Sequence, residues 1–88
     1  MRYTVKFTER ARNNLLKLDK STSKLILAWI RKNLENCEDP RRHGKALTAN
    51  LSGQWRYRVG NYRILAQIDD NEITILVLEI GHRRDIYK

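Results

Sequence analysis

Cysteine is almost absent from this sequence, and so are long apolar stretches. Cys37 is the single cysteine among 88 residues, so the chain cannot form an internal disulfide bond, and a reducing compartment suits it. The apolar runs are far shorter than the roughly 20 residues that a membrane-spanning helix needs. No apolar segment of the kind found in secretory signals follows the N-terminal residues. We therefore expect a cytoplasmic protein that makes no contact with a membrane.

Acidic residues are scarce relative to basic ones. The sequence has 18 lysines and arginines against 10 acidic residues, which gives a formal net charge of +8 at pH 7 and an isoelectric point near 10.1. Such an excess favours a polyanionic partner, namely nucleic acid, an anionic membrane surface or an acidic protein, although a solvated basic surface is the plain alternative. The apolar share of 41% suits a folded chain, and 88 residues are enough for one domain.

The first half of the chain predicts one strand followed by two helices. Residues 3–7 alternate apolar and polar side chains, as a half-buried strand does. Thr8 is a plausible N-cap for a short amphipathic helix that ends near Asp19. A second helix should begin at Ser21 or Thr22 and stop before the only proline of the chain, because the residue before a proline is biased away from helix. Its buried stripe would be Leu25, Ile26, Trp29, Ile30, Leu34 and Cys37.

The segment from residue 39 to residue 53 breaks this helical pattern, and we expect an ordered loop there. Leu47 and Leu51 would hold the loop against the rest of the domain. Its basic cluster consists of Arg41, Arg42, His43, Gly44 and Lys45.

The last third of the chain predicts a β-meander. Alternating or β-branched residues fill the ranges 54–59, 62–69 and 72–80, and two dipeptides that suit two-residue hairpin turns, Gly60-Asn61 and Asp70-Asn71, separate them. The order of elements is then β–α–α–β–β–β. We expect a single α+β domain over residues 1–88, with two N-terminal helices packed on one face of a mainly antiparallel sheet.

The first hairpin turn determines which side chains share a face of the sheet. With Gly60 and Asn61 in the turn, Arg58 lies opposite Arg63, and residues paired across strands point to the same face. One face is then apolar and meets the helices, whereas the other carries Arg56, Arg58, Arg63 and Gln67. A second turn at Asp70-Asn71 would pair Ile68 with Ile73, Ala66 with Ile75 and Ile64 with Val77, and would place Thr74, Leu76 and Leu78 beside the arginines.

Three arginines on one open sheet face indicate a bound anion. Like charges set opposite each other destabilise a sheet, so the repulsion needs a compensating partner. The alternative is that these side chains extend into water or pair with carboxylates from elsewhere in the chain. After the last strand, Gly81 could bend the chain so that Arg83 and Tyr87 return to the arginines. Tyr87 could equally pack the C-terminus, and His82 could be a surface histidine.

Three segments together resemble the RelE/ParE superfamily of bacterial toxin–antitoxin toxins, and the RelE-type messenger RNA interferases most closely. They are residues 39–47, 53–63 and 79–87, in this order and at this spacing, and the resemblance covers nearly the whole chain. It implies a two-helix layer on an antiparallel sheet, as in other small microbial ribonucleases. It also implies cleavage of mRNA in the ribosomal A site and neutralisation by a cognate antitoxin protein that wraps the toxin.

The resemblance also implies roles for individual residues. By similarity, the basic residues on the strands match Arg56, Arg58 and Arg63. The catalytic arginine and tyrosine of the tail match Arg83 and Tyr87, and a histidine used by some relatives matches His82. RelE in its best-known form has lysines at the first two strand positions, so a role that needs a proton-releasing lysine there is not expected in this chain.

These side chains suit RNA cleavage by attack of the 2′-hydroxyl on the adjacent phosphate. Arginine stays cationic and grips phosphate oxygens bidentately, but with a pKa above about 12 it is a poor base. The hypothesis is therefore that Tyr87 is the base, with His82 as the alternative, that Arg58 and Arg63 hold the phosphate, that Arg83 acts at the leaving oxygen and that Arg56 orients the RNA. RNA binding would further involve Arg41, Arg42, Lys45 and Arg84, and basic residues of the helices would contact ribosomal RNA.

The sequence predicts no metal site and no cofactor. The cysteine and the two histidines lack the spacing of a zinc site, and no paired carboxylates are evident. Two other functions remain open. One is a ParE-like inhibitor that binds DNA gyrase without nuclease activity, and the other is a non-catalytic module that binds nucleic acid.

Overall fold

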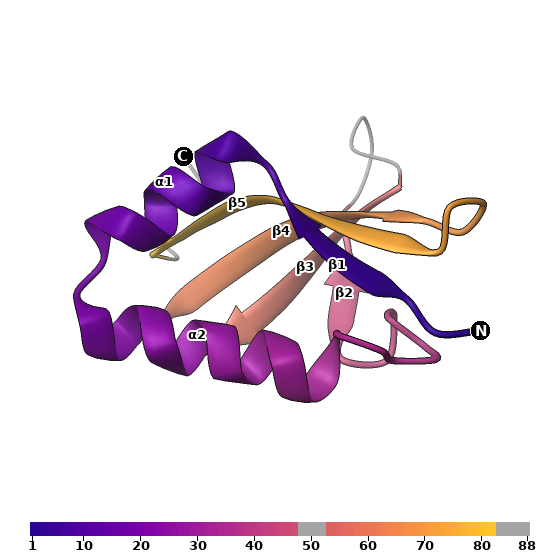
Figure 1. Ribbon diagram of the computed structural model, residues 1–88, viewed down its shortest axis with the longest axis horizontal. Coiled ribbons are helices and arrows are strands. Elements are labelled where there is room, and N and C mark those ends of the chain that lie inside the picture. Colours follow the sequence, from indigo (N-terminus) through magenta and orange to yellow (C-terminus); the bar gives the residue numbers. More distant parts are fainter. Residues whose placement is uncertain (48–52, 83–88) are drawn as a thin grey trace.

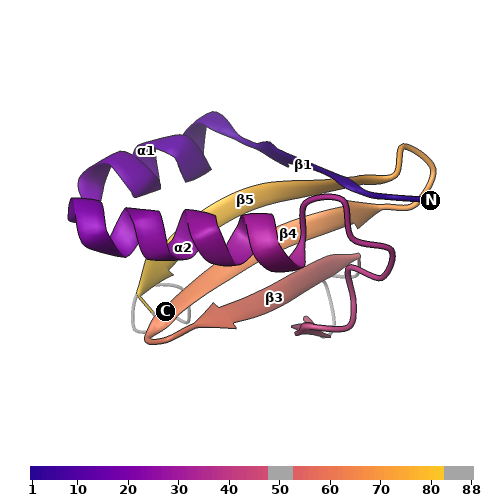
Figure 2. The same cartoon turned by 60° about the horizontal axis from the view of Figure 1, so that its bottom comes forward.

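The computed structural model describes residues 1–47 and 53–82, which form five strands and two helices (Figure 1). Both helices lie on one side of the sheet, with α2 running along it in front of the strands (Figure 2). Neither helix combines the length and the apolar composition of a membrane-spanning segment. In chain order, the elements are β1 (Thr4–Phe7), α1 (Glu9–Lys17), α2 (Lys20–Asn33), β2 (Gly44–Ala46), β3 (Gln54–Val59), β4 (Tyr62–Asp69) and β5 (Thr74–His82).

The sheet is mixed, and its strands lie in the order β1-β5-β4-β3-β2. The outermost strand β1 runs parallel to β5, whereas the three other neighbouring pairs are antiparallel. This arrangement confirms the predicted α+β domain with two helices on one face of a mainly antiparallel sheet. We call the face that is turned away from α1 and α2 the outer face.

The helices begin where polar side chains can accept hydrogen bonds from their first turns. Thr8 caps α1 as predicted, because its hydroxyl oxygen accepts a hydrogen bond from the Ala11 amide. The cap of α2 is Asp19, not Ser21 or Thr22. Its carboxylate accepts hydrogen bonds from the Thr22 amide and from the hydroxyls of Ser21 and Thr22. A carboxylate is favoured there because the N-terminal end of the helix dipole is positive.

The core lies between α2 and the sheet. Ile26 and Ile30 of α2 and its C-cap Leu34 are buried at helical spacing and pack with Tyr57 and other apolar residues of the central strands. The Trp29 ring lies 5.7 Å from the Tyr57 ring, measured between centroids. The sequence predicted that Leu25 belongs to this stripe. That prediction was wrong, because Leu25 is 61% exposed.

The hairpin of β3 and β4 has the predicted register. Arg58 pairs with Arg63 and Tyr57 with Ile64, across a turn in which Gly60 has a φ of +58°. Glycine is suited to that conformation because it has no side chain to clash there. Because residues paired across strands share a face, Arg63 lies on the outer face together with Arg58.

The register predicted between β4 and β5 was wrong by two residues. Ile68 pairs with Ile75 and Ala66 with Val77, because the turn spans residues 70–73 instead of two residues. The Asp69 carboxylate accepts hydrogen bonds from the amides of residues 71 and 72, and this stabilises a wider turn. A β-bulge then inserts one extra residue into β5, so that the register shifts again and Ile64 pairs with Ile80.

The predicted loop between the second helix and the meander contains a strand, β2, and this part of the prediction was wrong. The three residues of β2 pair antiparallel with β3, with Lys45 opposite Arg56. Gly44 permits the approach, since a Cβ atom there would lie 2.6 Å from ring atoms of Trp55. Leu51, one of the two leucines expected to hold this loop, lies outside the described residues.

Candidate functional site

Arg58 and Arg63 form a pair across β3 and β4 on the outer face, and they differ sharply in exposure. Arg58 is exposed, whereas Arg63 is only 4% exposed. On its other side Arg63 is paired with Gly81 of β5, which has no side chain to separate the guanidinium group from that strand. The register thus brings together two of the predicted catalytic residues, one at the surface and one beneath it.

Arg63 is held incompletely by its neighbours. Its Nη1 donates a hydrogen bond of 3.2 Å to the carbonyl oxygen of Tyr62 and a longer one of 3.5 Å to that of Gly60. Its buried Nε finds no hydrogen-bond partner, and within residues 1–47 and 53–82 no carboxylate forms a salt bridge with Arg63. A buried cation without a counter-ion is costly, and an anion at this position would relieve the cost.

A basic cleft opens at the β2 edge of the sheet, beside the arginine pair. It has a volume of about 330 Å³, and within residues 1–47 and 53–82 no acidic residue lines it. Lys45 and Arg56 are paired across β2 and β3, so their side chains emerge side by side. The lining residues are Arg42, His43, Gly44, Lys45, Arg56 and Arg58, and they include three of the five residues predicted to bind RNA together with Arg58.

The loop that carries this cleft is attached to the core through aromatic residues. The Tyr57 hydroxyl donates a hydrogen bond to the carbonyl oxygen of Pro40, and burial raises the pKa of Tyr57 well above its ordinary range. His43 meets the Trp29 ring edge to face, with the centroids 6.3 Å apart. The base of the loop is thus fixed, while His43 itself stays exposed.

Arg41 is not among the lining residues of the cleft, and its guanidinium group is paired with a carboxylate. Its guanidinium forms a bidentate ion pair with Asp70, with N···O distances of 2.9 and 3.1 Å, and the Tyr3 hydroxyl donates to the same carboxylate. Hydrogen bonds from Arg41 and Tyr3 lower the pKa of Asp70 below its usual range. This ion pair joins the loop to the turn between β4 and β5, and the RNA-binding role that the sequence suggested for Arg41 stays a prediction.

His82 lies on the other side of the sheet from the arginines. It pairs with Tyr62 at the end of β5, and the two rings meet edge to face with their centroids 5.6 Å apart. Tyr62 is also paired with Val59, a core residue of β3, so this row faces the helices. The remaining predicted site residues, Arg83, Arg84 and Tyr87, lie outside the described part of the chain.

Glu79 is a carboxylate on the outer face that the sequence did not indicate. The bulge in β5 places Glu79 opposite Leu65, and Arg10 of α1 forms an ion pair of 2.9 Å with Glu79. A bulge leaves no clear pattern in an apolar strand, so nothing in the sequence indicated that Glu79 would turn towards this face. Because Arg10 already balances its charge, Glu79 is not a counter-ion reserved for the arginines.

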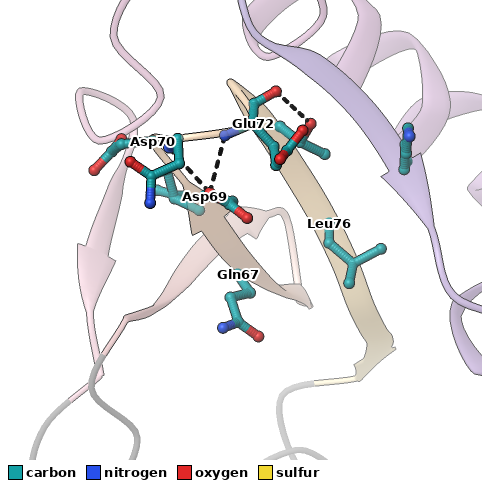
Figure 3. Close-up of a pocket in the computed structure, with 9 residues that line it drawn as sticks. Gln67, Asp69, Asp70, Glu72 and Leu76 are labelled. Atoms are coloured by element: carbon teal, nitrogen blue, oxygen red, sulfur yellow. Dashed lines mark hydrogen bonds between the residues drawn. The ribbon is translucent and has the colours of Figure 1, made fainter.

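A second, larger cavity lies at the opposite end of the sheet and has a different character (Figure 3). It has a volume of about 680 Å³ and borders the turn between β4 and β5, where Asp69 accepts hydrogen bonds from the turn amides. Lys6 and Gln67 also line it. In the described ranges, no group of three or more histidine, cysteine or acidic residues is placed to hold a metal ion. The sheet is therefore basic at one end and acidic at the other.

Known proteins resemble this chain over nearly its whole length. Residues 5–87 match the family model described as ParE toxin of type II toxin-antitoxin system, parDE. Toxin RelG of Mycobacterium tuberculosis is 39% identical over 88 residues, which cover 100% of this chain and 99% of that protein.

Solved structures of toxins have the same fold. In the toxin–antitoxin complex RelBE2 from Mycobacterium tuberculosis, the matching chain is 36% identical with a TM-score of 0.84, over 94% of this chain and 93% of that one. A free mutant of the Escherichia coli toxin RelE superposes with a TM-score of 0.77 at 22% identity, over 99% of this chain and 92% of that one. At that identity, the second match shows a shared fold alone.

Proposed function

This chain belongs to the ParE toxin family of type II toxin–antitoxin systems, within the RelE/ParE superfamily, and from that premise we propose that it is an endoribonuclease that cleaves mRNA in the ribosomal A site. The observation that carries the proposal is the pairing of exposed Arg58 with buried Arg63 beside a cleft whose described lining residues are all basic or neutral. Such a surface suits a phosphodiester, because guanidinium groups bind phosphate oxygens in a bidentate geometry.

The proposed reaction uses the RNA's own 2′-hydroxyl as the nucleophile. The 2′ oxygen forms a bond to the adjacent phosphorus while the bond from phosphorus to the 5′ oxygen breaks. The products are a 2′,3′-cyclic phosphate and a new 5′-hydroxyl. The protein must accept the 2′ proton, stabilise the negative charge that builds up on the phosphoryl oxygens and assist the leaving oxygen, which then takes up a proton.

Arg58 and Arg63 are assigned to the charge on the phosphoryl oxygens. Arg58 is exposed and can meet the phosphate directly, whereas Arg63 would act from below through a guanidinium edge whose Nε lacks a partner. Fixed donors in a site that excludes water stabilise such charge without reorganising at the moment of reaction. Arg56 would orient the neighbouring RNA from the cleft.

Tyr87 is the proposed base, and Arg83 is the proposed residue at the leaving oxygen. A tyrosine titrates near 10 in water, and neighbouring arginine charges would lower that value. The alternative base, His82, pairs with Tyr62 on the helix side of the sheet, which favours Tyr87 of the two. The ribosome would hold the RNA in the in-line geometry that the attack needs.

The partners in this proposal are the translating ribosome with its mRNA and a cognate antitoxin. Similar toxins have been solved in toxin–antitoxin complexes, which supports an antitoxin protein for this chain as well. The net charge of +8 would favour both an acidic antitoxin and ribosomal RNA.

The test is to incubate the purified chain with mRNA, in the presence and in the absence of programmed ribosomes, and to map the new RNA ends. We expect cuts within the A-site codon that carry 2′,3′-cyclic phosphates and appear only with ribosomes. Intact mRNA in both reactions would contradict the proposal. Cleavage of free mRNA would show that the reaction does not require the ribosome.

A ParE-like action on DNA gyrase is the second candidate, because the family model that matches residues 5–87 is that of ParE. It predicts inhibition of DNA supercoiling by purified gyrase and unchanged mRNA. The same preparation of the chain can be used in both assays, so the two functions are distinguished directly. A non-catalytic nucleic-acid-binding module would bind RNA, but it would neither cleave mRNA nor inhibit gyrase.

A further inference from the structure

The basic cleft has the size and the charge of a site for one nucleotide. Sites for small molecules usually measure about 300–1,000 Å³, and the cleft, at about 330 Å³, lies at the lower end of that range. Arg42, Lys45 and Arg56 line it, and in the part of the chain that the structure describes no acidic residue does. A single phosphate with its sugar and base would fit both the volume and the charge.

The cleft also leads directly to the arginine pair. Arg56 lines the cleft and Arg58 follows two positions later on β3, on the same face of the sheet. Two residues along a strand span about 6.7 Å, which is comparable to the distance between successive phosphates of a nucleic acid strand. An RNA strand could therefore run straight along β3. It would place one phosphate beside Lys45 and Arg56 and the next beside Arg58 and Arg63.

His43 adds a flat ring to this set of cations. The side chain is exposed at the cleft, and its edge-to-face contact with Trp29 holds the plane of the imidazole, with no ring of the described residues stacked on it. Trp29 in turn lies against buried Tyr57, so the support extends into the core. Proteins that bind single-stranded RNA commonly stack bases on aromatic side chains, histidine included, beside a positively charged groove.

We propose that this cleft binds the nucleotide next to the cleaved bond, with its phosphate between Lys45 and Arg56 and its base stacked on His43. His43 is then an RNA-binding residue, and Trp29 is the positioning residue that holds it. The inference rests on the proposed ribonuclease function, because it places the scissile phosphate at Arg58 and Arg63. An acidic peptide would use the same cations, but it has no need for a ring at His43.

The test measures binding without cleavage. Fluorescently labelled hexamers of 2′-O-methyl RNA cannot react, and a single abasic position can be moved along them. With the wild-type chain, we expect an abasic nucleotide at one position to weaken binding by about tenfold or more, because a stacked base is lost. This scan does not depend on the folding of any variant.

The second arm changes the protein. His43→Ala should weaken binding of the intact hexamer by a similar factor, and the sensitive abasic position should then cause no further loss. Asn71→Ala is the control, because Asn71 is exposed at the opposite, acidic end of the sheet. Thermal melting of both variants verifies that they fold.

Three outcomes would overturn the inference. The first is that an abasic nucleotide has the same effect on affinity at every position of the hexamer. The second is that a folded His43→Ala variant binds the intact hexamer as tightly as the wild type. The third is that a glutamate-rich peptide displaces the RNA and binds the His43→Ala variant and the wild type with equal affinity. Failure of the proposed function is seen separately. If RNA binding depends on His43 but ribosome-bound mRNA stays intact, the proposed nuclease function is refuted and the proposed nucleotide site in the cleft is supported.

Discussion

Arg63 is the residue whose environment is hardest to explain by folding alone. It is 4% exposed and carries an unpartnered Nε, although its neighbours in the register are Arg58 and Gly81, neither of which can balance its charge. Buried charges normally have counter-ions, and no carboxylate of residues 1–47 and 53–82 forms an ion pair with Arg63, which makes its burial costly. The proposed function explains this cost, because the missing anion would be the phosphate of the RNA.

Replacing Arg63 should therefore separate stability from activity. We expect Arg63→Met, which keeps much of the length and removes the charge, to leave the free energy of unfolding unchanged or to raise it by about 1 kcal/mol. Cleavage of ribosome-bound mRNA should fall by about 100-fold or more. Urea unfolding and single-turnover cleavage measure the two quantities. A loss of more than about 2 kcal/mol would instead indicate that Arg63 mainly stabilises the β3–β4 hairpin.

At the scale of the element, the N-terminus of α2 depends on a single carboxylate. Hydrogen bonds from the hydroxyls of Ser21 and Thr22 and from the Thr22 amide lower the pKa of Asp19 from its ordinary 3.8 to about 2. Because the pKa is lower in the folded state than in the unfolded state, the cap stabilises the protein fully above the ordinary value. That contribution is lost as the pH falls from about 4 to about 2.

Asp19→Ala should remove this stabilisation together with its pH dependence. We expect the variant to melt about 5 °C below the wild type at pH 7, since a lost cap affects a small domain to about that extent. The difference should shrink as the pH falls from 4 to 2. Thermal melts at several pH values measure it, and a difference that stays constant down to pH 2 would show that the carboxylate's charge is not what stabilises α2.

The same scale shows how far the sequence could predict the elements. The β3–β4 hairpin was predictable in full, because Gly60 and Asn61 give an unambiguous two-residue turn. The β4–β5 turn was not, because Asp69 closes a wider turn through its side chain, which the dipeptide Asp70-Asn71 does not reveal. The short strand β2 was also missed, since its pairing depends on the space at Gly44, a tertiary contact.

The candidate site was predictable where it depends on local register and not where it depends on loops. Arg58 and Arg63 follow from the alternation of two strands around a known turn. The ion pair of Arg41 with Asp70 joins segments that are far apart in sequence, and no local sequence pattern predicts it. The side of the sheet on which His82 lies depends on the β-bulge in β5, which shifts the alternation by one residue.

For the whole molecule, the distribution of charge matters more than the net value of +8. Lys45 on β2 and Lys6 on β1 are both exposed, and their register partners place them on the outer face at opposite edges of the sheet. Lys45 lines the basic cleft, whereas Lys6 lines the cavity that also contains Asp69. RNA should therefore contact one lysine and not the other.

This asymmetry predicts different salt dependences for two matched variants. Lys45→Ala should reduce the slope of log affinity for single-stranded RNA against log salt concentration by about 0.7, the value for one lost phosphate contact. Lys6→Ala removes the same charge from the same face and should leave the slope unchanged. Titrations from low to moderate salt measure both, and equal slopes for the two variants would show that RNA responds only to net charge.

The most direct test of the central claim is the single-turnover cleavage rate of Arg58→Lys on programmed ribosomes. Lysine keeps the charge but not the bidentate geometry, and Arg58 is exposed, so folding should be unaffected. We predict a rate lower by about 100-fold, with Arg2→Lys, an exchange of the same type at an exposed ion pair with Glu38, as the control. A rate for folded Arg58→Lys within about threefold of wild type would contradict a catalytic role for the arginine pair.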